Sequence, residues 1–251
     1  MIAHRLLLAA LVAALPSLAP AATVTITMQE YEYGNVNSAL TARDTFMGGT
    51  TTAGEDFEGF TACPQSLCAS GTISSGVGSF TGYGTVFSGG LSQVDPKAQI
   101  VVRNNTQNPY GRFNVAPNGG TNWLDSNDRE GIMWSVLAPG STYLKRIAFL
   151  LTDLDDVNKV IFSIMVMDGS TTLATLPRAS TTTNLGNGKL HLVTMFFAKP
   201  TDDIRIKMIN GPGDGFGIDG VRVAAVPLPA GGVLLLAALG GLALLRRRRT
   251  A

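Results

Sequence analysis

Two almost continuously apolar runs stand out in the sequence: Lys189-Leu-His-Leu-Val-Thr-Met-Phe-Phe197 and Val160-Ile-Phe-Ser-Ile-Met-Val-Met167. Both are short and rich in β-branched and aromatic residues, and neither has the spacing of an amphipathic helix. Such runs are typical of strands in the interior of a sheet. The centre of the chain is therefore predicted to be β-structure.

Further short apolar segments lie on both sides of these runs. The first, Thr23-Val-Thr-Ile-Thr-Met28, alternates with a period of two, as a half-buried strand does. Turn signals such as Ala138-Pro-Gly140, Asp168-Gly169 and Gly186-Asn-Gly188 separate the later segments. With the two apolar runs included, the predicted strands after this first segment are residues 98–103, 131–137, 144–151, 159–167, 171–176, 190–197, 203–209 and 216–223.

This pattern predicts an all-β domain, an antiparallel two-sheet β-sandwich over residues 23–225. Residues 34–90 are weakly patterned and glycine-rich, so we expect loops and short strands there and no long helix. Residues 224–227 are expected to form a short linker into the C-terminal segment.

The N-terminus has the features of a secretory signal peptide. His4 and Arg5 precede an apolar core of about 10 residues, and Ala19 and Ala21 suit the small-residue positions of a cleavage site. Residues 1–22 are therefore predicted to be removed on export.

The C-terminus combines three parts in a fixed order. Val226-Pro-Leu-Pro-Ala230 precedes an apolar run that ends at Leu245, and Arg246, Arg247, Arg248 and Arg249 follow. Residues 228–245 are predicted to form a transmembrane helix. The arginines would stay on the cytoplasmic side and place the body outside.

Residues 226–251 resemble the VPLPA-CTERM sorting signal, a variant of the PEP-CTERM signals of Gram-negative bacteria. The resemblance is carried by Val226, Pro227, Leu228, Pro229 and Ala230, by the apolar segment and by the arginines Arg246 to Arg249. It implies export, anchoring in the inner membrane with the body in the periplasm, and processing by an exosortase-type protease. Delivery to the cell surface or the extracellular matrix would follow.

Three segments of the body also resemble exported proteins with such tails: residues 120–128, 149–156 and 214–219. The last of them is similar to the final strand of lectin-like jelly-roll sandwiches. The resemblance implies a jelly-roll fold and leaves the activity open.

The charge of the body argues against nucleic-acid binding. Residues 23–225 hold 14 basic and 18 acidic residues, a net charge of −4, whereas nucleic-acid-binding domains carry a basic patch. The tail arginines supply the excess of positive charge in the whole chain.

The only cysteines are Cys63 and Cys68. In an exported protein the default expectation is a disulfide closing a small loop. A zinc site is the alternative, but no histidine or second cysteine pair lies nearby to complete four ligands.

The densest acidic cluster, Asp153, Asp155 and Asp156, together with Asp219, gives a candidate Ca²⁺ site. Oxygen ligands on loops suit calcium, which takes six to eight of them. The alternative is that these aspartates cap turns by bonding to their own backbone. No other cofactor is predicted.

A histidine, a glycine-rich segment and a tryptophan are further candidates for catalysis or ligand binding. His191, the one histidine of the body, lies inside an apolar run and is expected to occupy a core position. The Gly215–Gly220 segment matches a nucleotide-binding pattern, but a strand rather than a helix is expected after it. Trp123 is the aromatic residue best placed for sugar stacking, since its loop is rich in Gly, Asn and Asp.

The sequence therefore predicts an exported surface or matrix protein without catalysis. A carbohydrate-binding module, Ca²⁺-assisted or not, is the alternative, with an extracellular polysaccharide as its partner. A polysaccharide-active hydrolase remains as a further alternative, since paired carboxylates about 5 to 9 Å apart would be required and the sequence does not specify that distance.

Overall fold

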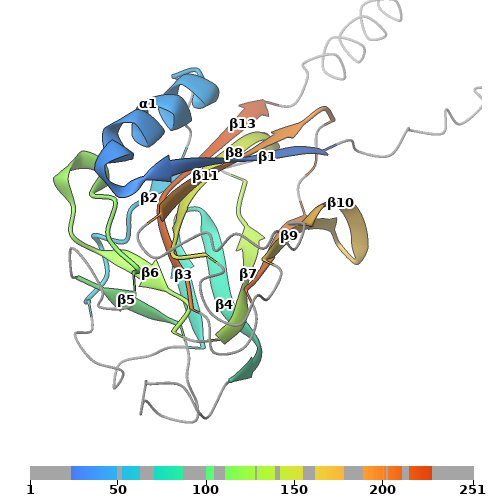
Figure 1. The fold of residues 1–251 in the computed structure, drawn as a ribbon. Coiled ribbons are helices and arrows are strands. Elements are labelled where there is room, and N and C mark those ends of the chain that lie inside the picture. The colour runs from blue at the N-terminus through green and yellow to red at the C-terminus, as the bar shows by residue number, and fades with distance from the viewer. Residues whose placement is uncertain are drawn as a thin grey trace, which may run out of the picture.

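The structure, a computed structural model, describes most of the body of the chain (Figure 1). The described residues are 24–49, 53–62, 71–86, 100–104, 111–127, 129–138, 142–154, 162–177, 189–199, 201, 203–210 and 215–227. The predicted signal peptide, Cys63, Cys68, Asp155, Asp156 and residues 228–251 lie outside them.

Two antiparallel sheets make up the fold, which confirms the predicted sandwich. The seven-stranded sheet has the order β1-β11-β8-β13-β6-β5. Its seventh strand, β2, pairs with residues 221–223 of β13, beyond the part of β13 that pairs with β6. Its strands are β1 (Val24–Glu32), β2 (Ala53–Glu55), β5 (Val101–Arg103), β6 (Trp123–Asp125), β8 (Thr142–Thr152), β11 (Lys189–Phe197) and β13 (Gly217–Pro227).

The six-stranded sheet has the order β10-β9-β12-β7-β4-β3. Its strands are β3 (Thr72–Ser75), β4 (Gly78–Val86), β7 (Arg129–Val136), β9 (Ser163–Asp168), β10 (Thr171–Pro177) and β12 (Ile204–Ile209). The two apolar runs of the sequence became β11 and β9, and each lies between two other strands, as predicted.

The core lies between the two sheets. Aromatic side chains connect them: Phe80 of β4 stacks on Trp134 of β7, and Trp134 meets Phe149 of β8 edge-on, with ring centroids 5.1 and 5.8 Å apart. The indole Nε1 of Trp134 donates to the carbonyl of Val77 at 3.1 Å, so the buried polar group is satisfied. Aromatic packing of this kind stabilises the contact between the layers.

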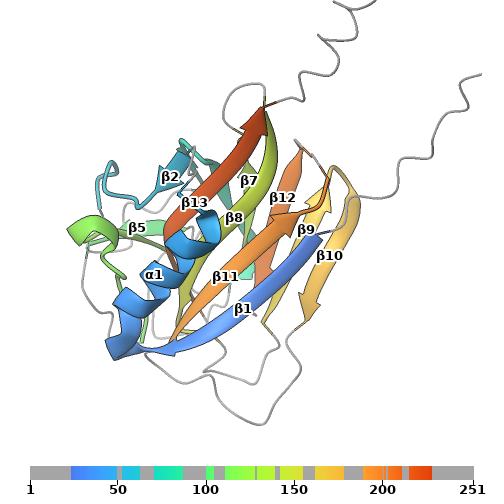
Figure 2. The same cartoon turned by 90° about the horizontal axis from the view of Figure 1, so that it is seen from above.

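A helix, α1 (Val36–Met47), corrects the expectation of loops and short strands after residue 34. It follows the 3₁₀ turn η1 (Tyr33–Asn35) and lies across the outer face of the seven-stranded sheet (Figure 2). Its buried residues are Ala39, Arg43 and Met47, which form a single narrow stripe. Because the middle of that stripe is an arginine, the apolar periodicity that would have announced the helix is weak.

Strand β13 also differs from expectation at its end. It runs to Pro227, where Val226 and Pro227 pair with Tyr143 and Thr142 of β8. The predicted linker is therefore part of the sheet, and the first two residues of the Val226–Ala230 segment belong to the strand. No helix among the described residues is long and apolar enough to cross a membrane.

Candidate functional site

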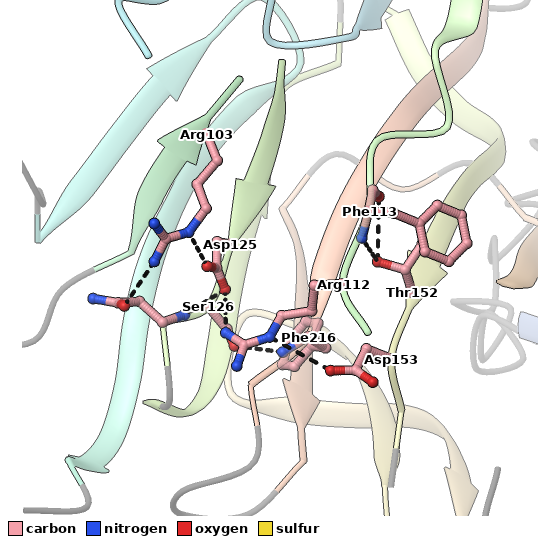
Figure 3. Close-up of polar contacts among 9 residues, drawn as sticks. Arg103, Arg112, Phe113, Asp125, Ser126, Thr152, Asp153 and Phe216 are labelled. Atoms are coloured by element: carbon pink, nitrogen blue, oxygen red, sulfur yellow. Dashed lines mark hydrogen bonds and ion pairs between the residues drawn. The ribbon is translucent and has the colours of Figure 1, made fainter. Parts of the chain in front are cut away.

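A network of buried charges lies where β5, β6 and the ends of β8 and β13 meet (Figure 3). At its centre is Asp125, the last residue of β6, whose side chain is fully buried. Arg103 of β5 donates from its Nε to one carboxylate oxygen, and Arg112 donates from Nη1 to the other at 2.7 Å. The backbone N–H of Asn127 also donates to Asp125, at 2.9 Å.

These neighbours decide the ionisation of Asp125. Burial opposes the charged form, but attraction by Arg112 and Arg103, with the hydrogen bonds from Arg103 and Asn127, outweighs it. The pKa of Asp125 is therefore lower than usual, and the carboxylate is held ionised in the interior.

The network extends to neighbouring elements. The Nε of Arg112 lies 3.5 Å from a carboxylate oxygen of Asp153, which follows β8 and has a φ of 61°. Ser126 exchanges two hydrogen bonds with Phe216 just before β13, its N–H donating at 2.9 Å and its Oγ accepting at 2.8 Å. Two arginines thus face two aspartates, and the charges compensate one another.

Asp219 on β13 is buried in a different setting. Its Oδ2 accepts from the N–H of Val115 at 3.1 Å, and its Oδ1 accepts from the N–H of Gly220 at 2.6 Å. Burial raises its pKa well above the usual value, these hydrogen bonds lower it, and the charges of Asp56 and Glu58 raise it further. A perturbed carboxyl can mark a functional site, but both oxygens of Asp219 are bound by backbone donors.

The predicted Ca²⁺ site has no support in the described part of the chain. There, no three His, Cys, Asp or Glu side chains gather in a way that could hold a metal ion. Asp153 faces the cationic Arg112 and Asp219 faces backbone donors, so their oxygens serve different partners. Asp155 and Asp156 lie outside the described residues, and their role stays a prediction.

The expectation that Trp123 could stack on a sugar is wrong, because this residue is completely buried and has no ring face open to a ligand. Its ring packs against the backbone of Gly217, where an added Cβ would lie 3.0 Å from the indole. His191 is 1% exposed within β11, which confirms its expected position in the core.

The outer face of the six-stranded sheet is the remaining candidate surface. Along β12, Ile204, Ile206 and Met208 point into the core, so Arg205 and Lys207 point outward. In the register of the sheet they are joined by side chains of neighbouring strands, all of them half-buried or exposed: Thr72, Ser74, Ser79, Thr81, Met133, Ser135, Met165, Met167, Thr172 and Thr175. Helix α1 packs on the other sheet and not on this face.

Sequence reasoning predicted this strand but missed both the face and the charge network. The alternation in Ile204-Arg-Ile-Lys-Met-Ile209 is a usable signal for two outward cations. Nothing in the sequence pairs Arg103 or Arg112 with Asp125. Arg103 approaches Asp125 only when β5 pairs with β6, and Arg112 lies in the segment between these strands.

No protein-family model matches the sequence, and neither does any curated protein. Among solved structures, the chain is similar to a Stig cyclase from Fischerella sp. TAU, with 15% identity, a TM-score of 0.34, and 52% of this chain and 76% of the cyclase covered. It is also similar to an apo-form cyclase from Fischerella sp., with 16% identity, a TM-score of 0.37, and coverage of 60% and 84%.

A third similar structure is TmCBM61 in complex with β-1,4-galactotriose, with 15% identity and a TM-score of 0.25, covering 53% of this chain and 85% of that one. Likeness at these scores carries no argument about what this chain binds or catalyses.

Proposed function

We propose that this chain is an exported, non-catalytic surface or extracellular-matrix protein. Its C-terminal apolar segment would hold it at the inner membrane with the sandwich in the periplasm, until an exosortase-type protease cleaves near Val226–Ala230. The resemblance of residues 226–251 to the sorting signal supports the route, and the signal-peptide features of residues 1–22 support export.

The occupancy of the buried carboxylates supports a role without catalysis. A general acid or base needs an oxygen within reach of a substrate. Both oxygens of Asp125 are taken by arginines, and both oxygens of Asp219 are taken by backbone N–H groups. In both groups each carboxylate oxygen has a protein partner, as expected of groups that stabilise the fold.

Cell fractionation combined with mass spectrometry of the full chain tests this proposal. The surface or matrix fraction is expected to contain a chain that lacks residues 1–22 and the arginines Arg246 to Arg249. A cytoplasmic chain that begins at Met1 would contradict export. An intact C-terminus on a surface chain would contradict processing while leaving the anchor in place.

A lectin-like jelly-roll that binds carbohydrate is the second candidate function. The observation that favours it is the outer face of the six-stranded sheet, which presents Ser135 beside Arg205 and further hydroxyl groups on β3 and β4. Glycan-array binding would support this function, and loss of that binding in EDTA would support its Ca²⁺-assisted form. Failure to bind any polysaccharide of the host matrix would contradict it.

A further inference from the structure

Arg205 and Lys207 have no carboxylate partner among the described residues, in contrast to four other cations of the domain. Arg43, Arg103, Arg112 and Lys189 each form an ion pair with an aspartate or a glutamate. The Nε of Arg205 is shielded from solvent and donates to no described residue. Among the described residues, no carboxylate therefore pairs with these two positive charges, although residues 23–225 have a net charge of −4.

The ammonium group of Lys207 is positioned by an aromatic ring on the same face of the sheet. Its Nζ lies 3.7 Å from the ring centroid of Tyr83 on β4, so the side chain extends across β7. Cation–π contact of this kind holds an ammonium group in place without neutralising it. The described carboxylates nearest in sequence to these strands, Asp168, Asp203 and Glu130, lie at strand ends.

Methionines and one serine flank the two cations in register, and further hydroxyl groups lie farther out on β3 and β4. On β3 and β4, Thr72 and Thr81 lie side by side and share a 3.0 Å hydrogen bond. Ser135 lies opposite Arg205, and on the other side of β12 Met167 lies opposite the same arginine. Adjacent strands are about 4.8 Å apart, and the face carries methionine and hydroxyl side chains around two central positive charges.

We propose that this face binds an extended anionic polysaccharide, with Arg205 and Lys207 recognising its carboxylates. Arginine matches a carboxylate with two parallel N–H donors, and lysine supplies a point charge. The threonine and serine hydroxyls would bond to the hydroxyls of the sugar. This inference rests on the carbohydrate-binding form of the proposed function and names its site and ligand class.

Binding of the full-length chain to polygalacturonate, measured by isothermal titration calorimetry at low and high salt, tests the proposal. Dextran serves as the uncharged probe and a single-stranded oligonucleotide as the polyanion that is not a polysaccharide. We expect binding to polygalacturonate that weakens with salt, and at least about a tenfold loss in the Arg205→Gln, Lys207→Gln double variant.

Lys145→Gln is the matched control, because Lys145 also lies over an aromatic ring, 4.4 Å from the centroid of Phe196, but on the other sheet. It should bind as the parent does, and thermal unfolding should show all variants folded. The proposal is overturned if the double variant binds as well as the parent, if dextran or the oligonucleotide binds equally tightly, or if polygalacturonate does not bind. Export and anchoring are decided separately by fractionation, so the two failures can be told apart.

Discussion

At the scale of single residues, Asp125 and Asp219 show how the same side chain takes opposite properties in one core. Both are buried, at 0% and 1% exposure. Two arginines hold the pKa of Asp125 below its usual value, whereas Asp219 has backbone donors and nearby carboxylates, and burial raises its pKa. Burial opposes ionisation of both carboxyls, and the arginines beside Asp125 reverse the direction of its pKa shift.

Replacing Asp125 with Asn should destabilise the domain by about 3–5 kcal/mol, because Arg103 and Arg112 would be left without their common counter-ion. Urea unfolding measures the change. Asp44→Asn is the control: Asp44 pairs with Arg43 but is 62% exposed, so its loss should cost less than about 1 kcal/mol. Equal effects of the two substitutions would contradict a structural role for the buried network.

The lowered pKa of Asp125 also predicts the direction of its acid sensitivity. An ionised carboxylate that is stabilised in the folded state contributes stability above its unfolded pKa, and that contribution is lost as pH falls through the folded pKa. The free energy of unfolding of Asp125→Asn should therefore fall less on acidification than that of the parent.

Asp219 should show the opposite dependence, since its pKa is raised. Its contribution is fully present below the unfolded pKa and is lost as pH rises toward the folded pKa. Asp219→Asn removes the ionisation, so its free energy of unfolding relative to the parent should increase as the pH rises from about 4 into the neutral range. A constant difference across that range, measured by urea unfolding, would show that Asp219 does not titrate there.

At the scale of elements, α1 explains how a helix can be hidden in a sequence. Its central buried residue, Arg43, donates from Nη1 to the carbonyl of Gly220 on β13 at 3.0 Å and pairs with Asp44. The helix ends at Gly48, whose φ of 64° and N–H bonds to Asp44 and Thr45 form a left-handed cap. The hydrogen bond of Arg43 with the sheet thus takes the place of an apolar contact. Prediction of a helix from sequence depends on such apolar residues.

The β3–β4 hairpin depends on a glycine. Gly78 has a φ of 121°, and a Cβ at this position would lie 2.0 Å from the carbonyl oxygen of Ser135 on the paired strand β7. Gly78→Ala should lower stability by more than about 1 kcal/mol, because both the dihedral and the neighbouring backbone resist it. Gly76→Ala, where a Cβ meets no atom within 4 Å, is the control and should be nearly neutral in thermal unfolding.

At the scale of the whole molecule, the start of β1 and the end of β13 lie at the same end of the seven-stranded sheet (Figure 2). Val24 of β1 pairs with Phe197 of β11. The strand β11 pairs with β8, and β8 pairs with β13, each time antiparallel. Since β13 extends to Pro227, at most about 10 Å of extended chain separates it from Ala230. An anchor in the predicted apolar segment would therefore hold this end against the lipid surface.

Two exposed hydrophobic residues allow this orientation to be measured. Leu137, 53% exposed, follows β7 and precedes the start of β8, whereas Tyr33, 47% exposed, follows β1 at the opposite end of the sheet. In the full-length chain anchored in vesicles, brominated lipids should quench the added fluorescence of Leu137→Trp more than that of Tyr33→Trp. Equal quenching in vesicles that carry the chain would contradict the orientation and leave the anchor intact, whereas failure to co-float with vesicles would contradict the anchor.

The sequence by itself determined the sandwich and the positions of most long strands, because alternation and turn residues are local signals. It also predicted the interior position of β11 and β9, and the buried place of His191. Only the tertiary structure decided that Trp123 is covered, that Asp125 joins two arginines and that Arg43 docks a helix. Each of these depends on contact between residues distant in the chain, such as Trp123 packed against Gly217, and such contacts form no local pattern.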